Sequence, residues 1–163
     1  MNSFQQLIKQ IASVLKKHNW QLVTAESCTG GLIASLLTEV PGSSVWFERG
    51  FVTYSNLAKE EMLSVPRHLL EEYGAVSEPV AKAMAKGALQ HSAAQIAVAV
   101  TGIAGPDGGS IDKPVGTVCL GWAALDREST TSRHQFIGNR QDIRLAACQE
   151  ALSGILLYMD SFA

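Results

Sequence analysis

The segment TAESCTGG, residues 24–31, places a carboxylate, a thiol and two hydroxyls side by side, directly before two glycines. The four side chains are those of Glu26, Ser27, Cys28 and Thr29. An apolar run leads into the segment and another leads out of it, which predicts a junction between a strand and a helix. Ser27 is therefore either a helix N-cap or a nucleophile whose oxyanion faces the amides at the start of that helix.

A serine nucleophile needs a base, and the histidines are poorly placed to supply one. All four lie in separate predicted elements, and none is next to a glycine-rich turn, although a Ser-His-Asp triad assembles in space and is not excluded by spacing. A lysine with a lowered pKa takes this role in Ser-Lys hydrolases. Lys59 begins a predicted helix one turn past Tyr54, whose hydroxyl is a candidate proton relay. On pattern alone, a lysine in this position is more often a solvated surface residue.

Cys28 is the rival nucleophile in the same segment. With Glu26 and Lys59 it would resemble the Cys-Glu-Lys arrangement of another class of amidases, and a helix N-terminus lowers the pKa of a thiol. If Ser27 caps the helix, however, Cys28 opens it and packs inward as a small apolar group. The sequence favours this buried role over a reactive one.

A second glycine-rich segment, TGIAGPDGGSIDKPVG at residues 101–116, follows the apolar run at 96–100. It has neither the GK[ST] ending of a phosphate-binding P-loop nor a GxGxxG pattern, so hydrolysis of a nucleoside triphosphate is not predicted. Its backbone amides are still suited to hold a phosphate or carboxylate, and a surface loop with turn glycines is the alternative. Two glycine-rich junctions in one α/β chain predict a ligand site at one edge of a sheet.

Composition excludes several other classes of protein. The chain has 163 residues, a net charge of −2 and a pI of about 6.1, so no basic field predicts a nucleic-acid or membrane partner. No apolar stretch reaches membrane-spanning length, and the first ten residues do not resemble a signal peptide. Three widely separated cysteines are typical of a reducing cytoplasm. The chain lacks HxH, HExxH and CxxC spacings, so we predict no metal and no cofactor.

Hydrophobic periodicity and turn residues predict helices and strands that alternate along the chain. They predict helices at 3–18, 27–39, 56–63, 67–73, 78–91 and 140–159, and strands at 20–24, 45–55, 96–100, 117–124 and 130–137. This order predicts an α/β fold in which residues 1–163 form a single three-layer α/β/α domain with a central mixed sheet.

Several long motifs in one order resemble the CinA C-terminal domain family over nearly the whole chain. They are TAESCTGG at 24–31, PGSSVWFERGFVTYSN at 41–56, GAVSEPVA at 74–81, TGIAGPDGGS at 101–110, KPVGTV at 113–118 and GNRQDIR at 138–144. Larger members of this family carry an additional N-terminal domain that can hydrolyse a pyrophosphate, for which this chain has no room. That activity is not carried over.

The resemblance implies hydrolysis of the carboxamide of nicotinamide mononucleotide to nicotinate mononucleotide and ammonia, within pyridine nucleotide salvage. It implies Ser27 as nucleophile with Tyr54 and Lys59 as the activating pair. It also implies a substrate pocket that is shaped and lined by Glu26, Thr29 and Gly30, and a homodimer. Amides near residues 28–30 are expected to hold the oxyanion.

The ribose and phosphate contacts are assigned to the loop at 101–109 and to an arginine at the start of the last predicted helix. The residues concerned are Thr101, Gly102, Ala104, Gly105 and Arg140, with Arg133 and Arg144 as alternatives to Arg140. Two other functions stay open: a non-catalytic regulatory module that binds a pyridine nucleotide, and an amidase for another small amide.

Overall fold

A computed structural model describes residues 2–162 of the chain. Within them, helices and strands follow one another in the order α1 (Asn2–His18), β1 (Leu22–Glu26), α2 (Leu32–Thr38), the 3-10 helix η1 (Ser43–Val45), β2 (Phe47–Val52), α3 (Asn56–Leu63), α4 (Arg67–Tyr73), α5 (Glu78–Gln90), β3 (Ile96–Gly102), β4 (Thr117–Ala124), β5 (Thr130–Gln135) and α6 (Arg140–Asp160).

The strands form one mixed sheet in the order β2-β1-β3-β4-β5. Strands β2, β1 and β3 run parallel to one another, whereas β4 runs antiparallel to both β3 and β5. The carboxyl ends of β1, β2 and β3 therefore lie at one edge of the sheet, together with the start of β4. This is the edge at which ligands bind in open α/β sheets.

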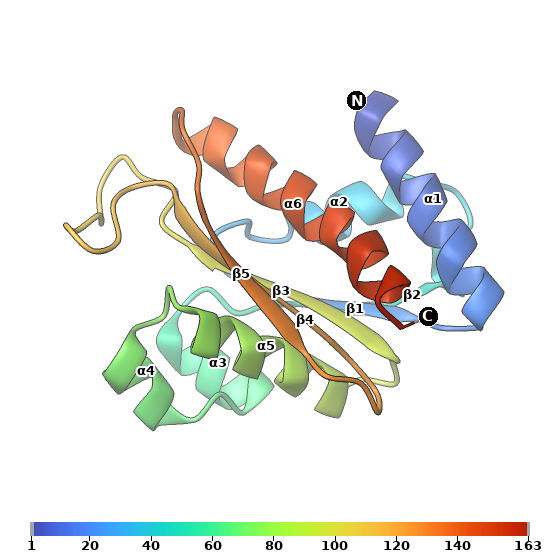
Figure 1. Ribbon diagram of the computed structural model, residues 1–163, viewed down its shortest axis with the longest axis horizontal. Helices are drawn as coiled ribbons and strands as arrows, with labels where there is room; N and C mark the ends of the chain where they lie inside the picture. The colour runs from blue at the N-terminus through green and yellow to red at the C-terminus, as the bar shows by residue number, and fades with distance from the viewer. Residues whose placement is uncertain (1, 163) are drawn as a thin grey trace.

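Helices cover both faces of the sheet (Figure 1). Helices α1, α2 and α6 lie on one face, and α3, α4 and α5 lie on the other. The structure confirms the predicted α/β fold, with three layers and a central mixed sheet.

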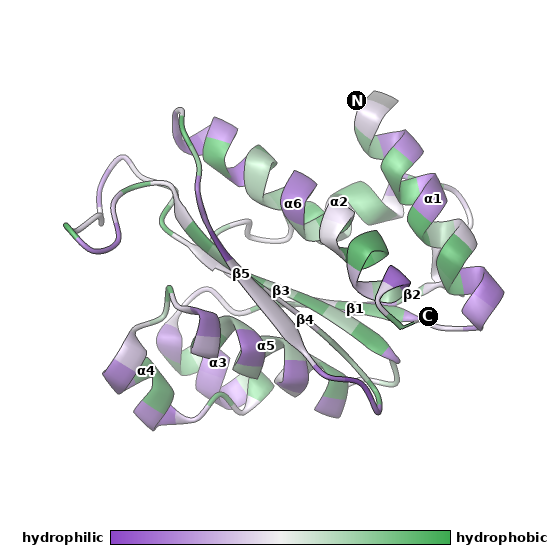
Figure 2. Ribbon diagram, viewed as in Figure 1, coloured by the Kyte–Doolittle hydropathy of each residue, from purple (hydrophilic) through white to green (hydrophobic). Residues whose placement is uncertain are grey.

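The residues of β3 alternate between two hydrophobic cores. Ile96, Val98 and Val100 pack with the core under α1, α2 and α6, whereas Ala97 and Ala99 pack with the core under α3–α5. Hydrophobic and hydrophilic residues alternate along the helices, whereas the central strands are mostly hydrophobic (Figure 2). A strand buried on both faces needs apolar residues at every position, which is the pattern that predicted it.

Alanine and glycine let α5 lie close to its neighbours. A Cβ atom at Gly121 of β4 would stand 2.7 Å from the carbonyl oxygen of Ala81 in α5, and one at Gly87 would stand 1.9 Å from that of Leu63. The backbones come this close at Gly121 and Gly87 only because glycine has no side chain. They fix α5, and α3 beside it, firmly against the sheet.

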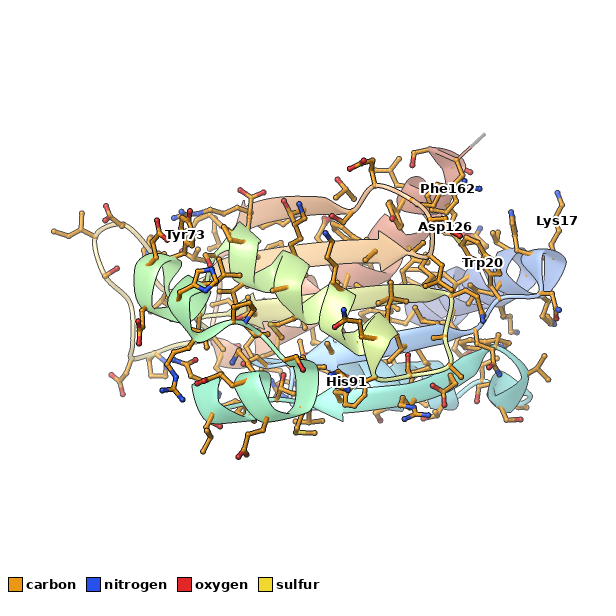
Figure 3. All side chains as sticks on the ribbon, turned by 90° about the horizontal axis from the view of Figure 1, so that it is seen from below. Lys17, Trp20, Tyr73, His91, Asp126 and Phe162 are labelled. Atoms are coloured by element: carbon orange, nitrogen blue, oxygen red, sulfur yellow. The ribbon has the colours of Figure 1, made fainter. Side chains whose placement is uncertain are left out.

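The end of the molecule opposite the carboxyl edge is closed by aromatic side chains. Trp20, Asp126 and Phe162 lie together there, far from Tyr73 at the other end (Figure 3). The rings of Trp20 and Phe162 have centroids 5.8 Å apart, and the guanidinium of Arg127 lies 4.9 Å from the Phe162 ring centroid. The chain terminus thus packs at the end away from the glycine-rich segments.

Most predicted elements agree with the structure to within two residues at each end, and the largest error concerns α2. This helix begins at Leu32 rather than at the predicted residue 27, because Gly30 and Gly31 take positive φ values of 59° and 101°. The preceding strand is also displaced, since β1 spans residues 22–26 rather than 20–24. The strand predicted at 45–55 spans only Phe47–Val52, and a 3-10 helix ends at Val45, the first residue of the predicted range.

None of the helices formed by residues 2–162 is both long enough and apolar enough to cross a membrane.

Candidate active site

A polar cavity of about 230 Å³ lies at the carboxyl edge of β1, β2 and β3. Its lining comes from five separate parts of the chain: Ser27, Cys28, Tyr54, Asn56, Lys59, Ala75, Val76, Thr101, Gly102, Ala104 and Arg140. The lining contains two basic residues, Lys59 and Arg140, and none of the lining residues is acidic. The cavity is thus suited to a ligand that carries negative charge.

Ser27 directly follows β1 and is held by the neighbouring strand. Its amide donates to the carbonyl of Val100 at 3.0 Å, and its own carbonyl accepts from the amide of Gly30 at 3.0 Å. The prediction that Ser27 caps a helix is wrong, because α2 starts five residues later with Gly31 at the N-cap position. The Ser27 hydroxyl is therefore free for a role in the cavity.

Glu26 supplies the cap that Ser27 does not. Its carboxylate accepts hydrogen bonds from the Thr29 hydroxyl at 2.6 Å and from the amides of Gly31, Ile33 and Ala34 at 3.2, 2.9 and 3.0 Å. A carboxylate at this position satisfies the free amides of a helix start.

Glu26 is only 1% exposed and lies outside the cavity lining. The prediction that Glu26, Thr29 and Gly30 line the pocket is not confirmed by this geometry, since none of the three reaches the cavity. Glu26 and Thr29 instead hold the turn that follows Ser27, and Gly30 supplies its left-handed backbone.

Lys59 points from the first turn of α3 to the base of the cavity. Its Nζ donates to Oγ of Ser27 at 3.1 Å and to the carbonyls of Thr53 and Tyr54 at 3.1 and 3.2 Å. The residue is 1% exposed, and no carboxylate within residues 2–162 forms an ion pair with it. Burial lowers the pKa of the Lys59 ammonium below its ordinary value, because desolvation disfavours the charged form.

The local sequence explains why Lys59 points inward. Ser55 caps α3 by accepting a hydrogen bond from the Ala58 amide at 3.0 Å, so the helix begins directly after the Tyr54 turn. Lys59 and Leu63 are the buried residues of this helix and lie four positions apart, on one face. The surface alternative for Lys59 is thereby excluded.

Cys28 lines the cavity but is not an activated thiol. The residue is 6% exposed, and burial raises its thiol pKa to about 11. At neutral pH the thiolate is therefore scarce, and the thiolate is the reactive form. The structure agrees with the prediction that Cys28 packs as a small buried group.

Tyr54 contributes its backbone and its side chain to different contacts. Its carbonyl accepts hydrogen bonds from Ser27 Oγ at 3.3 Å and from Lys59 Nζ, whereas its hydroxyl accepts from Nη2 of Arg140 at 3.3 Å. The residue is 62% exposed. The proposed proton relay through the hydroxyl is absent from this geometry, because that hydroxyl bonds to Arg140 rather than to Ser27 or Lys59.

Arg140 connects three parts of the site at the start of α6. Besides Tyr54, it donates through Nη1 to the carbonyl of Gly105 at 2.7 Å. The N-terminus of α6 is fixed by a capping box between Asn139 and Asp142, so the position of Arg140 is well defined. Arg140 lines the cavity as expected.

The other two candidate arginines do not line the cavity. Arg133 on β5 donates to the carbonyl of Asp112 in the long loop. Arg144 donates to the carbonyls of Cys28 and Thr29. Both guanidinium groups therefore already hold backbone carbonyls.

The long loop after β3 contributes three of its four expected residues. Thr101, Gly102 and Ala104 line the cavity, and Gly105 contacts Arg140 through its carbonyl without reaching the cavity. Gly102 is required for packing, because a Cβ there would stand 2.7 Å from a methyl of Val118.

Sequence reasoning missed three lining residues, Asn56, Ala75 and Val76. Each lies in a motif that was recognised as a whole, YSN at 54–56 or GAVSEPVA at 74–81, without assignment of these positions to the site. The structural reason that Ala75 reaches the cavity is a hydrogen bond of 2.9 Å from Thr101 Oγ1 to the Ala75 carbonyl, which ties the two segments together.

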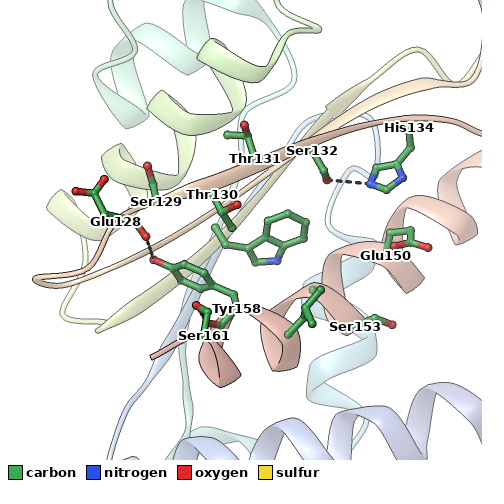
Figure 4. A pocket seen from close by; sticks show the side chains of 13 residues that line it. Glu128, Ser129, Thr130, Thr131, Ser132, His134, Glu150, Ser153, Tyr158 and Ser161 are labelled. Carbon is green, nitrogen blue, oxygen red and sulfur yellow. Dashed lines mark hydrogen bonds between the residues drawn. The ribbon is translucent and has the colours of Figure 1, made fainter. Parts of the chain in front are cut away.

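A larger hollow of about 500 Å³ lies between β5 and α6 (Figure 4). It contains a second possible nucleophile, Ser132, with His134 Nε2 at 2.8 Å from its Oγ. No carboxylate among the described residues is hydrogen-bonded to this His134, and both residues lie in β5, which pairs with β4. A strand gives Ser132 no cluster of free amides for an oxyanion. We therefore assign the candidate site to the Ser27 cavity.

Potential metal ligands are dispersed. In the part of the chain that the structure describes, no three His, Cys, Asp or Glu side chains are grouped so that they could hold a metal ion.

The fold and the site define a three-layer α/β protein with a buried serine–lysine pair at the carboxyl edge of its sheet. The CinA C-terminal domain family matches residues 4–159. The chain belongs to this family.

Related proteins match along most of the chain. It is 52% identical over 151 residues to the nicotinamide-nucleotide amidohydrolase PncC of Enterobacter agglomerans, covering 93% of this chain and 92% of that protein. It is 49% identical to the protein of the same name in Pseudomonas putida, with coverage of 96% and 97%. A CinA-like protein of Akkermansia muciniphila is 53% identical over 92% of this chain, which spans only 36% of that longer relative.

Solved structures support the same relationship. The competence/damage inducible protein CihA of Agrobacterium tumefaciens superposes with a TM-score of 0.92 at 46% identity, covering 94% of each chain. A CinA superfamily protein of Escherichia coli has a TM-score of 0.90 at 37% identity, covering 94% of this chain and 88% of that one.

Proposed function

We propose that this protein hydrolyses the carboxamide of nicotinamide mononucleotide to nicotinate mononucleotide and ammonia. Relatives that bear the name nicotinamide-nucleotide amidohydrolase match over nine-tenths of both chains. The observation that carries the proposal is the contact of 3.1 Å between Ser27 Oγ and Lys59 Nζ at the base of a polar cavity. A binding module has no need of a buried lysine beside a free hydroxyl.

In the first step, Ser27 is the nucleophile and Lys59 is the base. Lys59 in its neutral form takes the proton of the Ser27 hydroxyl, and Oγ forms a bond to the carboxamide carbon. The carbonyl oxygen becomes an oxyanion, which needs hydrogen-bond donors in a water-poor site. When the tetrahedral species collapses, the C–N bond breaks and the departing nitrogen receives the proton from Lys59, so ammonia leaves.

The second step reverses these roles with water in place of ammonia. Lys59 takes a proton from the water, whose oxygen attacks the acyl carbon. The bond between that carbon and Ser27 Oγ then breaks, and Oγ regains a proton from Lys59. The product is nicotinate mononucleotide. Neither step requires a group beyond those of the chain and the water.

The electrostatics of the cavity favour an anionic nucleotide. Arg140 supplies positive charge to its lining, and acidic residues are absent from that lining within residues 2–162. A volume of about 230 Å³ suits a group of the size of one aromatic ring, because pockets for whole drug-sized ligands are roughly 300–1,000 Å³. We therefore place the pyridine carboxamide in the cavity and the phosphate near Arg140 at its rim.

Thr101, Gly102 and Ala104 are proposed to contact the substrate from the β3 side of the cavity. Tyr54 is proposed to orient Arg140 through its hydroxyl and to support Ser27 and Lys59 through its carbonyl. A role in pyridine nucleotide salvage, a cytoplasmic location and a homodimeric state stay predictions from the sequence.

The test is release of ammonia from nicotinamide mononucleotide by the purified protein. We expect release that depends on Ser27, with the Ser27→Ala variant inactive. Tight binding of the nucleotide without ammonia would favour the regulatory module instead. Activity on other small carboxamides, with none on this nucleotide, would favour the amidase of different specificity. Either result would overturn the proposal.

A further inference from the structure

Arg144 binds the turn that carries the candidate nucleophile. From the second turn of α6, its Nε donates to the carbonyl of Cys28 at 3.1 Å and its Nη2 donates to the carbonyl of Thr29 at 2.9 Å. Two consecutive carbonyls are thus held by one planar guanidinium, 115 and 116 residues away in the sequence. The contact lies outside the cavity, so Arg144 does not touch a ligand there.

The same turn is held from its other side by Glu26. The Glu26 carboxylate accepts hydrogen bonds from the amides of Gly31, Ile33 and Ala34 and from the Thr29 hydroxyl. Arg144, in contrast, donates hydrogen bonds to carbonyls of the turn. The carboxylate of Glu26 therefore binds N–H groups of this segment, and the guanidinium of Arg144 binds its carbonyl groups.

Two amides of the turn are left over. The Ser27 amide donates to Val100 and the Gly30 amide donates to Ser27, but the amides of Cys28 and Thr29 have no protein acceptor among residues 2–162. Of these two residues only Cys28 lines the cavity, whereas Thr29 is fully buried. The Cys28 amide directly follows the nucleophile, where a donor of the oxyanion hole is found in other serine hydrolases. The Gly30 amide, which the sequence also suggested as a donor, is already occupied.

The orientation of these amides follows from the carbonyls. In a trans peptide the N–H and C=O bonds point in opposite directions. Arg144 holds the Cys28 carbonyl toward α6, so the Thr29 amide of the same peptide points away from α6. The Ser27 carbonyl is directed into the turn toward Gly30, so the Cys28 amide points out of it.

We propose that Arg144 is a positioning residue: by holding the carbonyls of Cys28 and Thr29 it fixes the turn so that the Cys28 amide donates to the oxyanion of the reaction at Ser27. This inference rests on the proposed function. Lysine retains the charge but lacks the rigid fork that reaches two carbonyls.

The experiment separates binding of the ground state from binding of a tetrahedral species. Pyridine-3-boronic acid is the tetrahedral probe: Ser27 Oγ adds to its boron, a B–O bond forms, Lys59 takes the serine proton, and the boronate hydroxyls occupy the oxyanion position. Nicotinate mononucleotide is the ground-state probe. The Kd of each is measured by calorimetry, together with kcat and KM for nicotinamide mononucleotide.

For Arg144→Ala we expect kcat to fall by roughly 10- to 100-fold, less than the 10²–10³ for complete loss of one oxyanion donor. The Kd of the boronate should rise by a similar factor, while KM and the Kd of nicotinate mononucleotide change by less than about 3-fold. Arg144→Lys should lie between this variant and the wild type. The Arg144→Lys variant also allows the proposal to be tested if Arg144→Ala does not fold.

Arg49→Ala is the matched control, because Arg49 also donates to a backbone carbonyl, that of His91 at 3.0 Å, but lies outside the cavity. It should leave all four quantities unchanged. Equal weakening of both probes in Arg144→Ala, or of neither, would overturn the positioning role. If the wild type releases no ammonia but binds the boronate in an Arg144-dependent manner, the proposed reaction fails and the positioning role stands.

Discussion

Lys59 Nζ lies 3.1 Å from Ser27 Oγ, with two backbone carbonyls at 3.1 and 3.2 Å completing its surroundings. A neutral amine has two N–H bonds and one lone pair. If the carbonyls of Thr53 and Tyr54 accept the two N–H bonds, the lone pair is directed at the Ser27 hydroxyl. The backbone of one turn therefore orients the base, without a carboxylate or histidine.

The first prediction concerns the base form of Lys59. Because burial lowers its pKa, kcat/KM should rise with pH as Lys59 loses its proton, with the midpoint below the ordinary lysine value. Lys59→Arg should be nearly as damaging as Lys59→Ala, since guanidinium does not deprotonate in this range. A pH–rate profile of the wild type and both variants checks this. An active Lys59→Arg enzyme would exclude the general-base role.

The same lowered pKa makes a prediction about stability. In the pH interval between the pKa of Lys59 in the folded protein and that in the unfolded chain, the unfolded state holds more protons, so the free energy of unfolding rises with pH. Lys59→Met has no titrating group at this position, so its free energy of unfolding lacks this dependence on pH. The Tm of the wild type should therefore increase relative to the Tm of Lys59→Met as the pH is raised through that interval. A difference that is constant with pH would show that Lys59 is not desolvated in solution.

A third prediction separates the two adjacent nucleophiles. Ser27→Ala should abolish turnover and cost about 0.5–1.5 kcal/mol of stability, since it removes hydrogen bonds of one hydroxyl but no helix cap. Cys28→Ala should retain most activity, because the thiol is protonated at neutral pH. Ammonia release and thermal unfolding of both variants are measured. The reverse ranking of activities would transfer the chemistry to Cys28.

Glu26 gives a fourth prediction, on stability. Glu26→Gln retains the size of the side chain but places N–H bonds among four donors. We expect a loss of about 1.5–3 kcal/mol, the range for a hydrogen bond to a charged group. Thermal unfolding checks it against Glu39→Gln, at the exposed other end of α2, which should change stability by less than about 0.5 kcal/mol. Equal stability of the two variants would show that the Glu26 cap is unimportant.

The comparison of sequence and structure shows where local patterns are sufficient. The continuous apolar run at 96–100 identified β3, because this signal depends on neighbouring residues only. The starts of α3 and α5 were also predicted correctly, and the structure shows that Ser55 and Ser77 cap them. The start of α2 was misplaced, since the residue that caps it is Glu26, five positions before the N-cap position, and a buried carboxylate was not recognised as a cap.

The candidate pair itself could be named from sequence but its geometry could not. Ser27 and Lys59 were selected by residue type and by the resemblance of their motifs to a family. That the Tyr54 carbonyl, rather than its hydroxyl, faces the pair depends on how β2 and α3 meet. The carbonyl contacts of Arg144 depend on α6 packing beside a turn more than a hundred residues away, which no local pattern encodes.

The last prediction concerns substrate size and Arg140. Its guanidinium reaches the cavity rim at the start of α6, where a phosphate would receive a charged, bidentate donor. We therefore expect nicotinamide mononucleotide to be preferred to nicotinamide riboside, which lacks the phosphate. A hydrogen bond to a charged group is worth roughly 1.5–3 kcal/mol, so Arg140→Ala should lower kcat/KM for the nucleotide by ~10- to 150-fold.

The riboside distinguishes recognition of the phosphate from support of the fold. Arg140→Ala should barely change the poor rate on the riboside, because the partner of the guanidinium is absent there. Arg127→Ala is the control, since it removes a guanidinium that lies over Phe162 at the opposite end of the molecule. Tyr54→Phe should reproduce a small part of the Arg140 effect on the nucleotide, as it removes one contact of that guanidinium. Equal losses on both substrates would mean that Arg140, through the Gly105 carbonyl, holds the long loop in place and does not bind the phosphate.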